Sequence, residues 1–524
     1  MLNEGRQSVE KIDTDESNRS GHSEIDLYSF HEQAAGRLVI DPGEAKVEFG
    51  EAVASRLKLS PDGTKVLWPQ PTDSMEDPQN WSDRRKLLML IIVTLVRPCS
   101  NFEPGVAAVF KLAIQYNITP AVINNRSTAW SIFLLGWGGI AAVILIRRVG
   151  RLPVLFWSQV LGVAFLVGAT FAPNLKTLIS MRCLSAFFAT TPQVTGLYIV
   201  TDLYPFHLQA RTLNIWTMGF IVSPFLSPFA LGFLVARTSW RWAFGIGSIY
   251  GAVVVVLIAL FVEETMYDRT VRPIPPRPTS GVRYRIESLV GITGLKMAKY
   301  RISWSEAIIS PLRVVWRPHI FGLLVFEALL FGFGIGINVT TGVLLGTPPP
   351  LGFSWSEFAI AGVYGTPIVS VILGELIGRY LNDGIMNWSI RRNKGIFEAE
   401  TRLWACYVAL PLYICGFLVL GAGFQKHLSP GAIVMGWGLA EVATMINTVA
   451  VSLTRLQGEI SALLNLWRTL GGFAVSYFQI PWATEHGALQ VFGVEAAIVA
   501  GLFLVVIPPL QRKGRSIRAR FSLH

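Results

Sequence analysis

Ionisable side chains interrupt several long apolar stretches of this sequence. The residues are Arg97, Glu103, Arg182, Glu327, Glu441, Arg468 and Glu495. In a membrane-spanning helix each would cost about 2.5–3.5 kcal/mol at the helix centre, so each needs a partner or a water-filled cavity. Such groups can take up a proton or pair with an opposite charge as their surroundings change. They predict proton binding and ion pairing inside the spans.

The positions of Glu103 and Arg182 predict that these two residues are partners. Glu103 lies about seventeen residues beyond Lys86 on an outward-running helix, and Arg182 about six residues into an inward-running one, so at about 1.5 Å per residue their depths are similar. We hypothesise that Glu103 alternates between a proton and an ionic partner. The alternative is a permanent bridge that only holds two helices together.

A second set of polar residues is predicted to face a substrate cavity. Its members are Arg97, Glu327, Asn338 and Glu441. Glu327 and Glu441 could bind substrate or a proton, and for each a helix-to-helix hydrogen bond is the alternative. In an apolar segment both arrangements satisfy a polar group that would otherwise be costly.

The composition of the chain is that of a membrane protein, in which these groups would be held by membrane-spanning helices. Of 524 residues, 52% are hydrophobic and only 15% charged, with a mean hydropathy of +0.46. Soluble globular proteins do not have this composition. The net charge of +11 sits in loops between apolar runs and not along one polar face, which argues against a nucleic-acid partner.

Twelve segments are long enough to span the bilayer, which takes about 20 apolar residues. Their approximate limits are 87–109, 127–146, 152–172, 177–201, 212–236, 242–262, 319–342, 355–379, 403–424, 430–453, 460–482 and 488–510. Lysine and arginine gather in alternate short loops, which predicts that both termini are cytoplasmic.

A long central connection divides the spans into six and six. The expected parts are a partly disordered tail over 1–84, an N-terminal bundle over 85–265, a cytoplasmic connection with an interfacial helix over 266–317, a C-terminal bundle over 318–510, and a basic tail over 511–524. Two six-helix halves are typical of secondary transporters.

Motifs for other chemistry are missing from the sequence. It has no G-x-x-x-x-G-K-[ST] and no GxSxG, and its seven histidines and four cysteines lack metal-binding spacing. We therefore expect no enzymatic activity, no metal and no cofactor, with a proton gradient as the energy source.

Several sequence blocks resemble a known family. They are DPQNWSDRRK, VGRLPV, MRCLSAFF, TDLYPFHLQAR, SPFLSPFALGF, SWRWAF, VEETMYDR, GELIGRYLND and RRNKGIFEAETRLW. With these blocks the chain resembles the major facilitator superfamily, and in particular the fungal branch similar to drug:proton antiporters. The resemblance runs from about Asp77 to Arg520 and implies an all-α membrane protein of twelve transmembrane helices in two six-helix bundles.

The resemblance also implies roles for particular residues. Gly150 and Arg151 match the family's loop between helices two and three, which implies a latch between the halves, and Asp202 is implied to pair with this basic turn. Arg182 matches an arginine that the family associates with proton coupling. The implied cytoplasmic gate consists of Arg147, Arg148, Gly150, Arg151, Asp202, Arg211, Asn382 and Asp383.

Two departures from the family pattern bear on activity. Ser223-Pro224 stands where the helix-five motif has Gly-Pro. The tyrosine, aspartate and proline usual between helices ten and eleven are missing from INTVAVSLTRLQGEISALLN, so span ten is expected to be short at its inner end.

The function expected from these features is proton-coupled export of a small apolar or amphipathic molecule, such as a drug or secondary metabolite, across the plasma membrane by a monomer. The alternatives are a proton-coupled nutrient importer and a non-transporting membrane receptor that kept the fold.

Overall fold

The computed structural model describes residues 41–100, 105–269, 279–349, 352–392, 399–452 and 458–520. Within these ranges the side chains of Arg97 and Arg211 are not described. Glu103, most of the expected N-terminal tail, and residues 453–457 of the junction between spans ten and eleven lie outside the described residues.

Helices cover the described parts of the expected spans of the N-terminal half. They are α5 (Asp83–Ser100), α6 (Gly105–Tyr116), α7 (Pro120–Asn124), the π-helix η3 (Asn125–Ala129), α8 (Trp130–Val149), α9 (Arg151–Thr170), α10 (Leu175–Ala189), α11 (Thr191–Leu203), α12 (Phe206–Arg237) and α13 (Arg241–Phe261). Pro224 and Pro228 lie inside α12, which continues past both.

The C-terminal half repeats this pattern of long helices. Its members are α17 (Pro318–Gly346), α18 (Glu357–Val363), α19 (Gly365–Arg392), the 3-10 helix η5 (Ala399–Leu403), α20 (Trp404–Gln425), α21 (Pro430–Ser452), α22 (Gly458–His486) and α23 (Ala488–Arg520). In the described part of the chain, eight helical stretches are long and apolar enough to cross a membrane. The predicted all-α membrane fold is confirmed.

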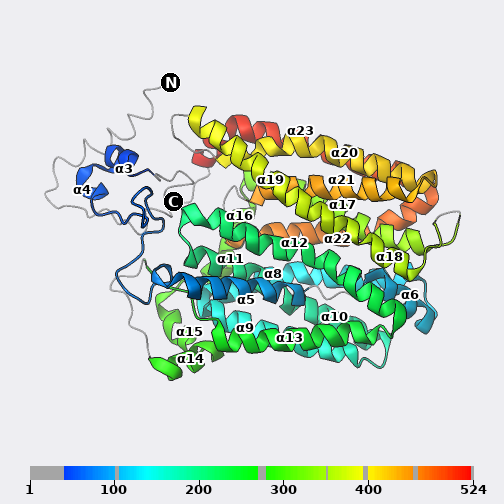
Figure 1. Ribbon diagram of the computed structural model, residues 1–524, viewed down its shortest axis with the longest axis horizontal. Helices are drawn as coiled ribbons and strands as arrows, with labels where there is room; N and C mark the ends of the chain where they lie inside the picture. The colour runs from blue at the N-terminus through cyan, green and yellow to red at the C-terminus, as the bar shows by residue number, and fades with distance from the viewer. Residues whose placement is uncertain are drawn as a thin grey trace.

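The helices of both halves run side by side along the long axis of the molecule, and the described part of the chain begins and ends at the same end of the bundle (Figure 1). We call this end the termini face and the opposite end the far face. The connection between the halves also lies at the termini face (Figure 1).

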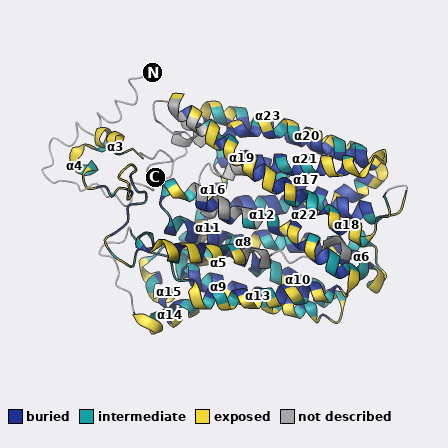
Figure 2. Cartoon of the chain, viewed as in Figure 1, coloured by how far each residue is buried: buried dark blue, intermediate teal, exposed yellow. Residues whose placement is uncertain are grey.

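Apolar side chains cover the outside of the bundle as well as filling it. On α13, Ile249, Val253, Val256 and Leu260 are 54–63% exposed and recur at i, i+4, i+7 and i+11, which is one face of a helix. Exposed residues mark the outer helices in Figure 2. A continuous exposed apolar stripe of this kind suits lipid and not water.

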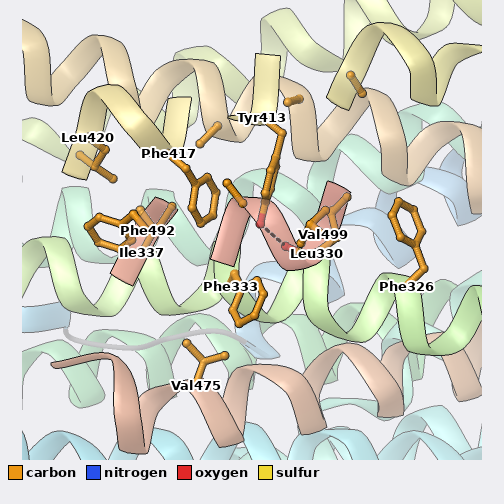
Figure 3. Packing of buried hydrophobic residues seen from close by; sticks show 14 of the residues in the cluster. Phe326, Leu330, Phe333, Ile337, Tyr413, Phe417, Leu420, Val475, Phe492 and Val499 are labelled. Carbon is orange, nitrogen blue, oxygen red and sulfur yellow. Dashed lines mark hydrogen bonds between the residues drawn. The ribbon is translucent and has the colours of Figure 1, made fainter. Parts of the chain in front are cut away.

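Aromatic and aliphatic side chains fill the interior of the C-terminal half (Figure 3). Tyr413 and Phe417 of α20 stack with ring centroids 4.2 Å apart. The Tyr413 hydroxyl donates to the Leu330 carbonyl of α17 at 3.2 Å. This bond gives a buried hydroxyl the partner that it needs.

The two halves pack along two seams. In the first, α8 lies against α22, where a Cβ on Gly136 would come within 2.1 Å of Thr469. In the second, α12 lies against α18 and α19, where Gly232 faces Ala361. Glycine at these points lets helix backbones approach closely, as is usual between membrane helices.

The central connection differs from the sequence expectation. In place of the expected single interfacial helix, α14 (Gly281–Val290) and α15 (Ile292–Met297) are separated by Gly291, whose φ of 104° ends the first helix. A further helix, α16 (Trp304–Val315), was not predicted. Its exposed Ile308 and Leu312 suit a position at the membrane surface.

The two ends of the chain carry additional helix. Before the first span, α3 (Pro42–Phe49) and α4 (Glu51–Ala54) form a small unit around Trp68, which also packs against Phe206 at the start of α12. The basic segment after residue 510 continues α23 as far as Arg520.

Candidate functional site

Arg151 and Asp202 form an enclosed ion pair at the termini face. Nε of Arg151 lies 2.7 Å from Oδ2 of Asp202, with side-chain exposures of 12% and 15%. The Thr265 hydroxyl donates to the same carboxylate at 2.9 Å. The Arg151 guanidinium also lies 5.3 Å from the Tyr198 ring centroid. The contact that the resemblance implied for Asp202 is therefore present, between α11 and the first residue of α9.

Glu264, which follows the last span of the N-terminal half, caps α9. Its carboxylate accepts the backbone N–H groups of Arg151 at 3.0 Å and Leu152 at 3.1 Å. A carboxylate is favourable here because the first N–H groups of a helix lack internal partners and carry partial positive charge. Gly150 permits this contact, since a Cβ at its φ of +116° would lie 2.5 Å from Glu264 Oε2.

The three arginines of this turn have different partners. Arg148 donates to the carbonyl oxygens of Ala298, at 2.9 Å, and of Ile302 in the central connection. Arg301 donates back to the Arg148 carbonyl at 3.0 Å. Arg147 lies near Tyr198. The connection between the halves is thus bound to the N-terminal half through Arg148.

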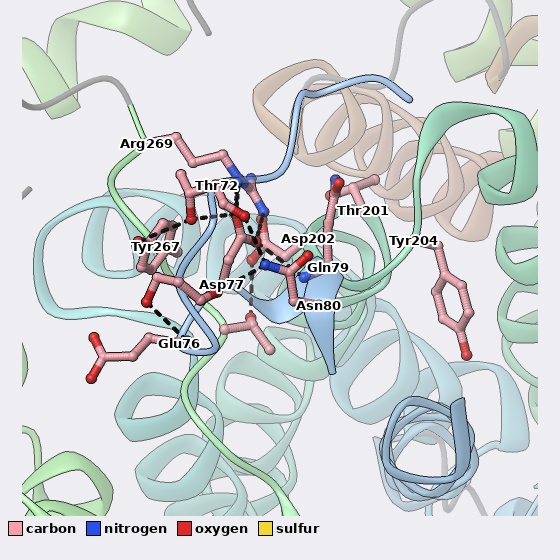
Figure 4. A network of polar contacts seen from close by, with 12 residues as sticks. Thr72, Glu76, Asp77, Gln79, Asn80, Thr201, Asp202, Tyr204, Tyr267 and Arg269 are labelled. Carbon is pink, nitrogen blue, oxygen red and sulfur yellow. Dashed lines mark hydrogen bonds and ion pairs between the residues drawn. The ribbon is translucent and has the colours of Figure 1, made fainter. Parts of the chain in front are cut away.

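A second ion pair joins the segment before the first span to the central connection. Arg269 Nη2 lies 2.6 Å from Oδ1 of the fully buried Asp77. Thr72 N–H donates to Asp77 at 2.9 Å and Gln79 N–H at 3.1 Å (Figure 4). Burial raises the pKa of Asp77, but Arg269 and these backbone donors outweigh burial and hold the pKa below its ordinary value.

We expect Asp77→Asn to loosen this segment by about 1–3 kcal/mol at pH 7, because a buried charge-assisted contact is lost. The unfolded pKa of aspartate is about 3.9. Since the folded pKa is lower, the stabilisation is fully present above the unfolded value and is lost as the pH falls through the folded value. Hydrogen exchange of the peptide covering 72–80 should therefore show a difference between variant and wild type that shrinks below about pH 4.

Asp73→Asn is the matched control. Asp73 pairs with Lys58 at 2.7 Å but is fully exposed, and exposed pairs contribute about 0–1 kcal/mol. Equal effects of the two substitutions, or a difference for Asp77→Asn that persists unchanged at low pH, would contradict the prediction.

In the C-terminal half, Glu327 and Arg468 form an ion pair inside the bundle. Nη2 of Arg468 on α22 lies 2.6 Å from Oε2 of Glu327 on α17, whose side chain is fully buried. Asn447 of α21 donates to the other carboxylate oxygen at 2.9 Å. For Glu327, the structure therefore shows the helix-to-helix contact that was the alternative to a substrate contact.

Glu441 belongs to a separate buried group. Asn338 and Trp437 are its hydrogen-bonding neighbours. Trp437 Nε1 donates to Asn338 Oδ1 at 2.8 Å, and the Tyr364 hydroxyl donates to the Asn338 carbonyl at 2.9 Å. An acid and an amide beside the contacting rings of Tyr364 and Trp437 could bind a polar group on an otherwise apolar molecule.

In the N-terminal half, Arg182 lies buried against η3. It donates to the Ser127 hydroxyl, and its guanidinium lies 5.7 Å from the Phe244 ring centroid. Ser127 lies within the π-helical turn Asn125–Ala129, a rare geometry that is frequent at functional sites. The predicted partner of Arg182, Glu103, lies outside the described residues.

Polar side chains also meet between the halves. Gln193 Nε2 of α11 donates to Asn465 Oδ1 of α22 at 2.8 Å. Next to it, Tyr198 and Ala462 belong to an apolar cluster formed by α8, α11 and α22. The N-terminal half thus contacts the C-terminal half close to the Arg151 and Asp202 pair.

Comparison with known proteins identifies the family. A sequence profile described as Major Facilitator Superfamily matches residues 90–476, which is most of the chain. The protein belongs to the major facilitator superfamily. It is therefore a multi-pass membrane transporter of small molecules and not an enzyme.

Relatives of this major facilitator protein include fungal transporters. The chain is 24% identical to the efflux pump radE of Floropilus chiversii, over 94% of this chain and 91% of radE. It is 25% identical to the MFS transporter fsa7 of a Fusarium species, over 78% and 80%. These similarities support an efflux-like fungal branch.

Solved structures agree on the fold. The xylose transporter XylE from E. coli aligns with a TM-score of 0.55 at 15% identity, over 81% of this chain and 99% of XylE. A structure of the peptide transporter POT aligns with a TM-score of 0.58 at 15% identity, over 82% and 95%. At this identity the likeness concerns the major facilitator fold alone.

The remaining predicted residues are placed as follows. Asn382 Nδ2 donates to the Gly378 carbonyl at 2.8 Å within α19, and Asp383 is exposed near Arg402. Ser223 is buried and Pro224 exposed on α12. Neither Asn382 nor Asp383 contacts the Arg151 and Asp202 pair among the described residues, so the structure does not bring the two parts of the expected gate together.

Sequence reasoning missed Glu375 on α19. Its side chain is 5% exposed, and both carboxylate oxygens lack a hydrogen-bond partner in the described part of this major facilitator chain. It stands in the block GELIGRYLND, which was used only as a family signature. An acidic residue inside an apolar span was the signal that could have identified it.

Proposed function

We propose that this transporter exports a small apolar or amphipathic molecule in exchange for protons, by alternating access between its two halves. The observation that carries the proposal is the set of buried charged groups on both sides of the contact between the halves. Arg182 lies on one side, and Glu327, Arg468 and Glu441 on the other. Groups of this kind in membrane spans mark proton or substrate pathways.

The relatives support the outward direction and the kind of cargo. The Floropilus chiversii relative is named an efflux pump, and another relative is named as the transporter of a trichosetin biosynthesis cluster. We propose a secondary metabolite or drug as the cargo here, bound near Glu441, Asn338 and Trp437, and we keep Arg97 of the opposite half as a proposed cargo contact.

Protons would supply the energy through Glu103 and Arg182. A proton falling through the membrane potential yields about 2.3 kcal/mol per 100 mV, which suffices for a modest gradient of cargo without ATP or a bound cofactor. The termini face would be cytoplasmic, because basic residues such as Arg84, Arg85 and Lys86 lie there next to a span. We place the protein in the plasma membrane as a monomer.

Vesicles with an imposed pH gradient test the proposal. The cargo is first identified by comparing metabolites of cells with and without the protein. We expect the cargo to move across the vesicle membrane in the direction opposite to protons. Glu103→Gln should abolish this pH-driven flux while folding is retained. Flux in the same direction as protons would instead make the protein an importer by symport, and no flux of any secreted metabolite would favour a receptor.

A further inference from the structure

The C-terminal half contains two fully buried carboxyl groups with different surroundings. Glu327 on α17 and Glu495 on α23 are both 0% exposed. Glu327 has the guanidinium of Arg468 at 2.6 Å. Among the described residues no cationic side chain pairs with Glu495, whose partner is the amide of Gln479 on α22. Two groups with equal burial therefore differ in whether a positive charge accompanies them.

This difference determines the charge that each carboxyl group can carry. A carboxylate removed from water is stable only with a compensating charge, and without one it takes up a proton. A neutral amide cannot compensate a full charge in an apolar interior. Arg468 supplies a compensating charge for Glu327, whereas the surroundings of Glu495 favour the neutral acid.

The partners of Glu495 can serve both forms of the acid. Gln479 Nε2 lies 3.1 and 2.9 Å from the two Glu495 oxygens, and Thr340 Oγ1 of α17 lies 2.6 Å from Gln479 Oε1. In this orientation the amide donates to a carboxylate and accepts from the threonine. If the amide turns over, the acid O–H donates to the glutamine carbonyl and the amide N–H donates to the threonine oxygen. The same heavy-atom positions thus hold the charged and the neutral group.

Gly336 leaves the space that the Gln479 amide occupies. A Cβ at Gly336 on α17 would lie 2.6 Å from Gln479 Oε1 and 2.3 Å from Val475 Cγ1. Any larger residue at this position would displace Gln479. The space next to the carboxyl group is therefore matched to one glutamine side chain.

Other titratable groups near Glu495 are few in the described chain. Tyr413 of α20 lies within electrostatic range of both Glu495 and Glu441. Glu327 on α17 lies 13 residues from Thr340, and Arg468 on α22 lies 11 residues from Gln479, so along their helices these groups are about 20 and 16 Å away. On α22, Glu485 and the half-exposed His486 lie about two turns beyond Gln479, at the far face.

We propose that Glu495 is a proton-binding site of the C-terminal half, held in either protonation state by Gln479 and Thr340. Thr340 lies two residues from Asn338 on α17, and Tyr413 lies within electrostatic range of both Glu495 and Glu441. A change in protonation can therefore reach the group that we assign to the cargo. This use of the site rests on the proposed function, whereas the bound proton itself does not.

Infrared difference spectroscopy of the purified full-length protein tests the proposal without a cargo. A protonated carboxylic acid has a carbonyl band separate from that of a carboxylate. We expect wild type at pH 7 to show such a band, to which any other protonated acid, such as the buried Glu375 or Glu441, adds its own component. Glu495→Gln, which preserves shape and hydrogen-bonding capacity, should remove the Glu495 component. The double substitution Glu327→Gln with Arg468→Met, which removes both members of the ion pair, should retain it.

Gln479→Met provides a second, independent result. If Glu495 is protonated in wild type, the band should persist in this variant and shift as the acid loses its amide partner. A band of the same intensity in wild type and Glu495→Gln, or one that is absent in wild type and appears only in Gln479→Met, would overturn the proposal. If wild type shows the Glu495 band but no proton-driven flux, the result would count against the proposed function and leave the proton site standing.

Discussion

Arg468→Met is expected to lower the free energy of unfolding by about 3–5 kcal/mol, because it leaves the Glu327 carboxylate buried without its charge partner. Arg468 Nε and Nη2 lie 2.8 and 2.6 Å from Oε2 of Glu327, and their side chains are 10% and 0% exposed. Adding Glu327→Gln should restore most of the loss, since Asn447 can still bond to the amide and no uncompensated charge remains. Unfolding in detergent of the four members of the cycle measures the coupling.

Arg512→Met is the control for Arg468→Met. Arg512 is an exposed arginine near the end of α23, and surface substitutions of this kind change stability by about 0.5 kcal/mol or less. A cost for Arg468→Met no larger than that of Arg512→Met would show that the pair adds nothing to stability. A double variant less stable than both single variants would show that the two groups do not act as a pair.

Breaking the Arg151 and Asp202 pair is expected to open the seam between the halves at the termini face. Asp202→Asn removes the partner of an enclosed guanidinium, which typically costs about 2–5 kcal/mol. Arg151 lies against Tyr198, and Tyr198 packs in one cluster with Ala462 of α22. If about half of the cost appears as seam opening, the open population rises about tenfold, since about 1.4 kcal/mol is a factor of ten. Asp202→Arg should act more strongly.

A single cysteine at position 462 measures this opening. Ala462 is 1% exposed, so in a variant with the native cysteines replaced, A462C should react slowly with a water-soluble thiol reagent. Asp202→Asn should accelerate the reaction about tenfold. Asp73→Asn removes an exposed ion pair with Lys58 and should leave the rate unchanged. Equal rates with and without Asp202→Asn would mean that the pair does not hold the gate.

Motif positions in the sequence were sufficient to predict one contact of the gate. The resemblance related Asp202 to the turn that contains Arg151, and the two side chains meet at 2.7 Å. The helix-two and helix-three turn is a local feature, with a glycine whose conformation and neighbours forbid a side chain. Glu264, which caps the same turn, lies 113 positions further along the chain and carries no pattern that connects it to α9.

The sequence by itself determined the number, order and approximate limits of the apolar helices, because hydropathy is summed over about 20 neighbouring residues and survives an error of a few positions. It also indicated most of the charged residues inside the spans, although it missed Glu375. Only the tertiary structure decided that Glu327 has an arginine, Glu495 an amide, and Glu375 no partner among the described residues. Each residue turns a helix by about 100°, so the partner of a side chain depends on how whole helices are rotated and packed against one another.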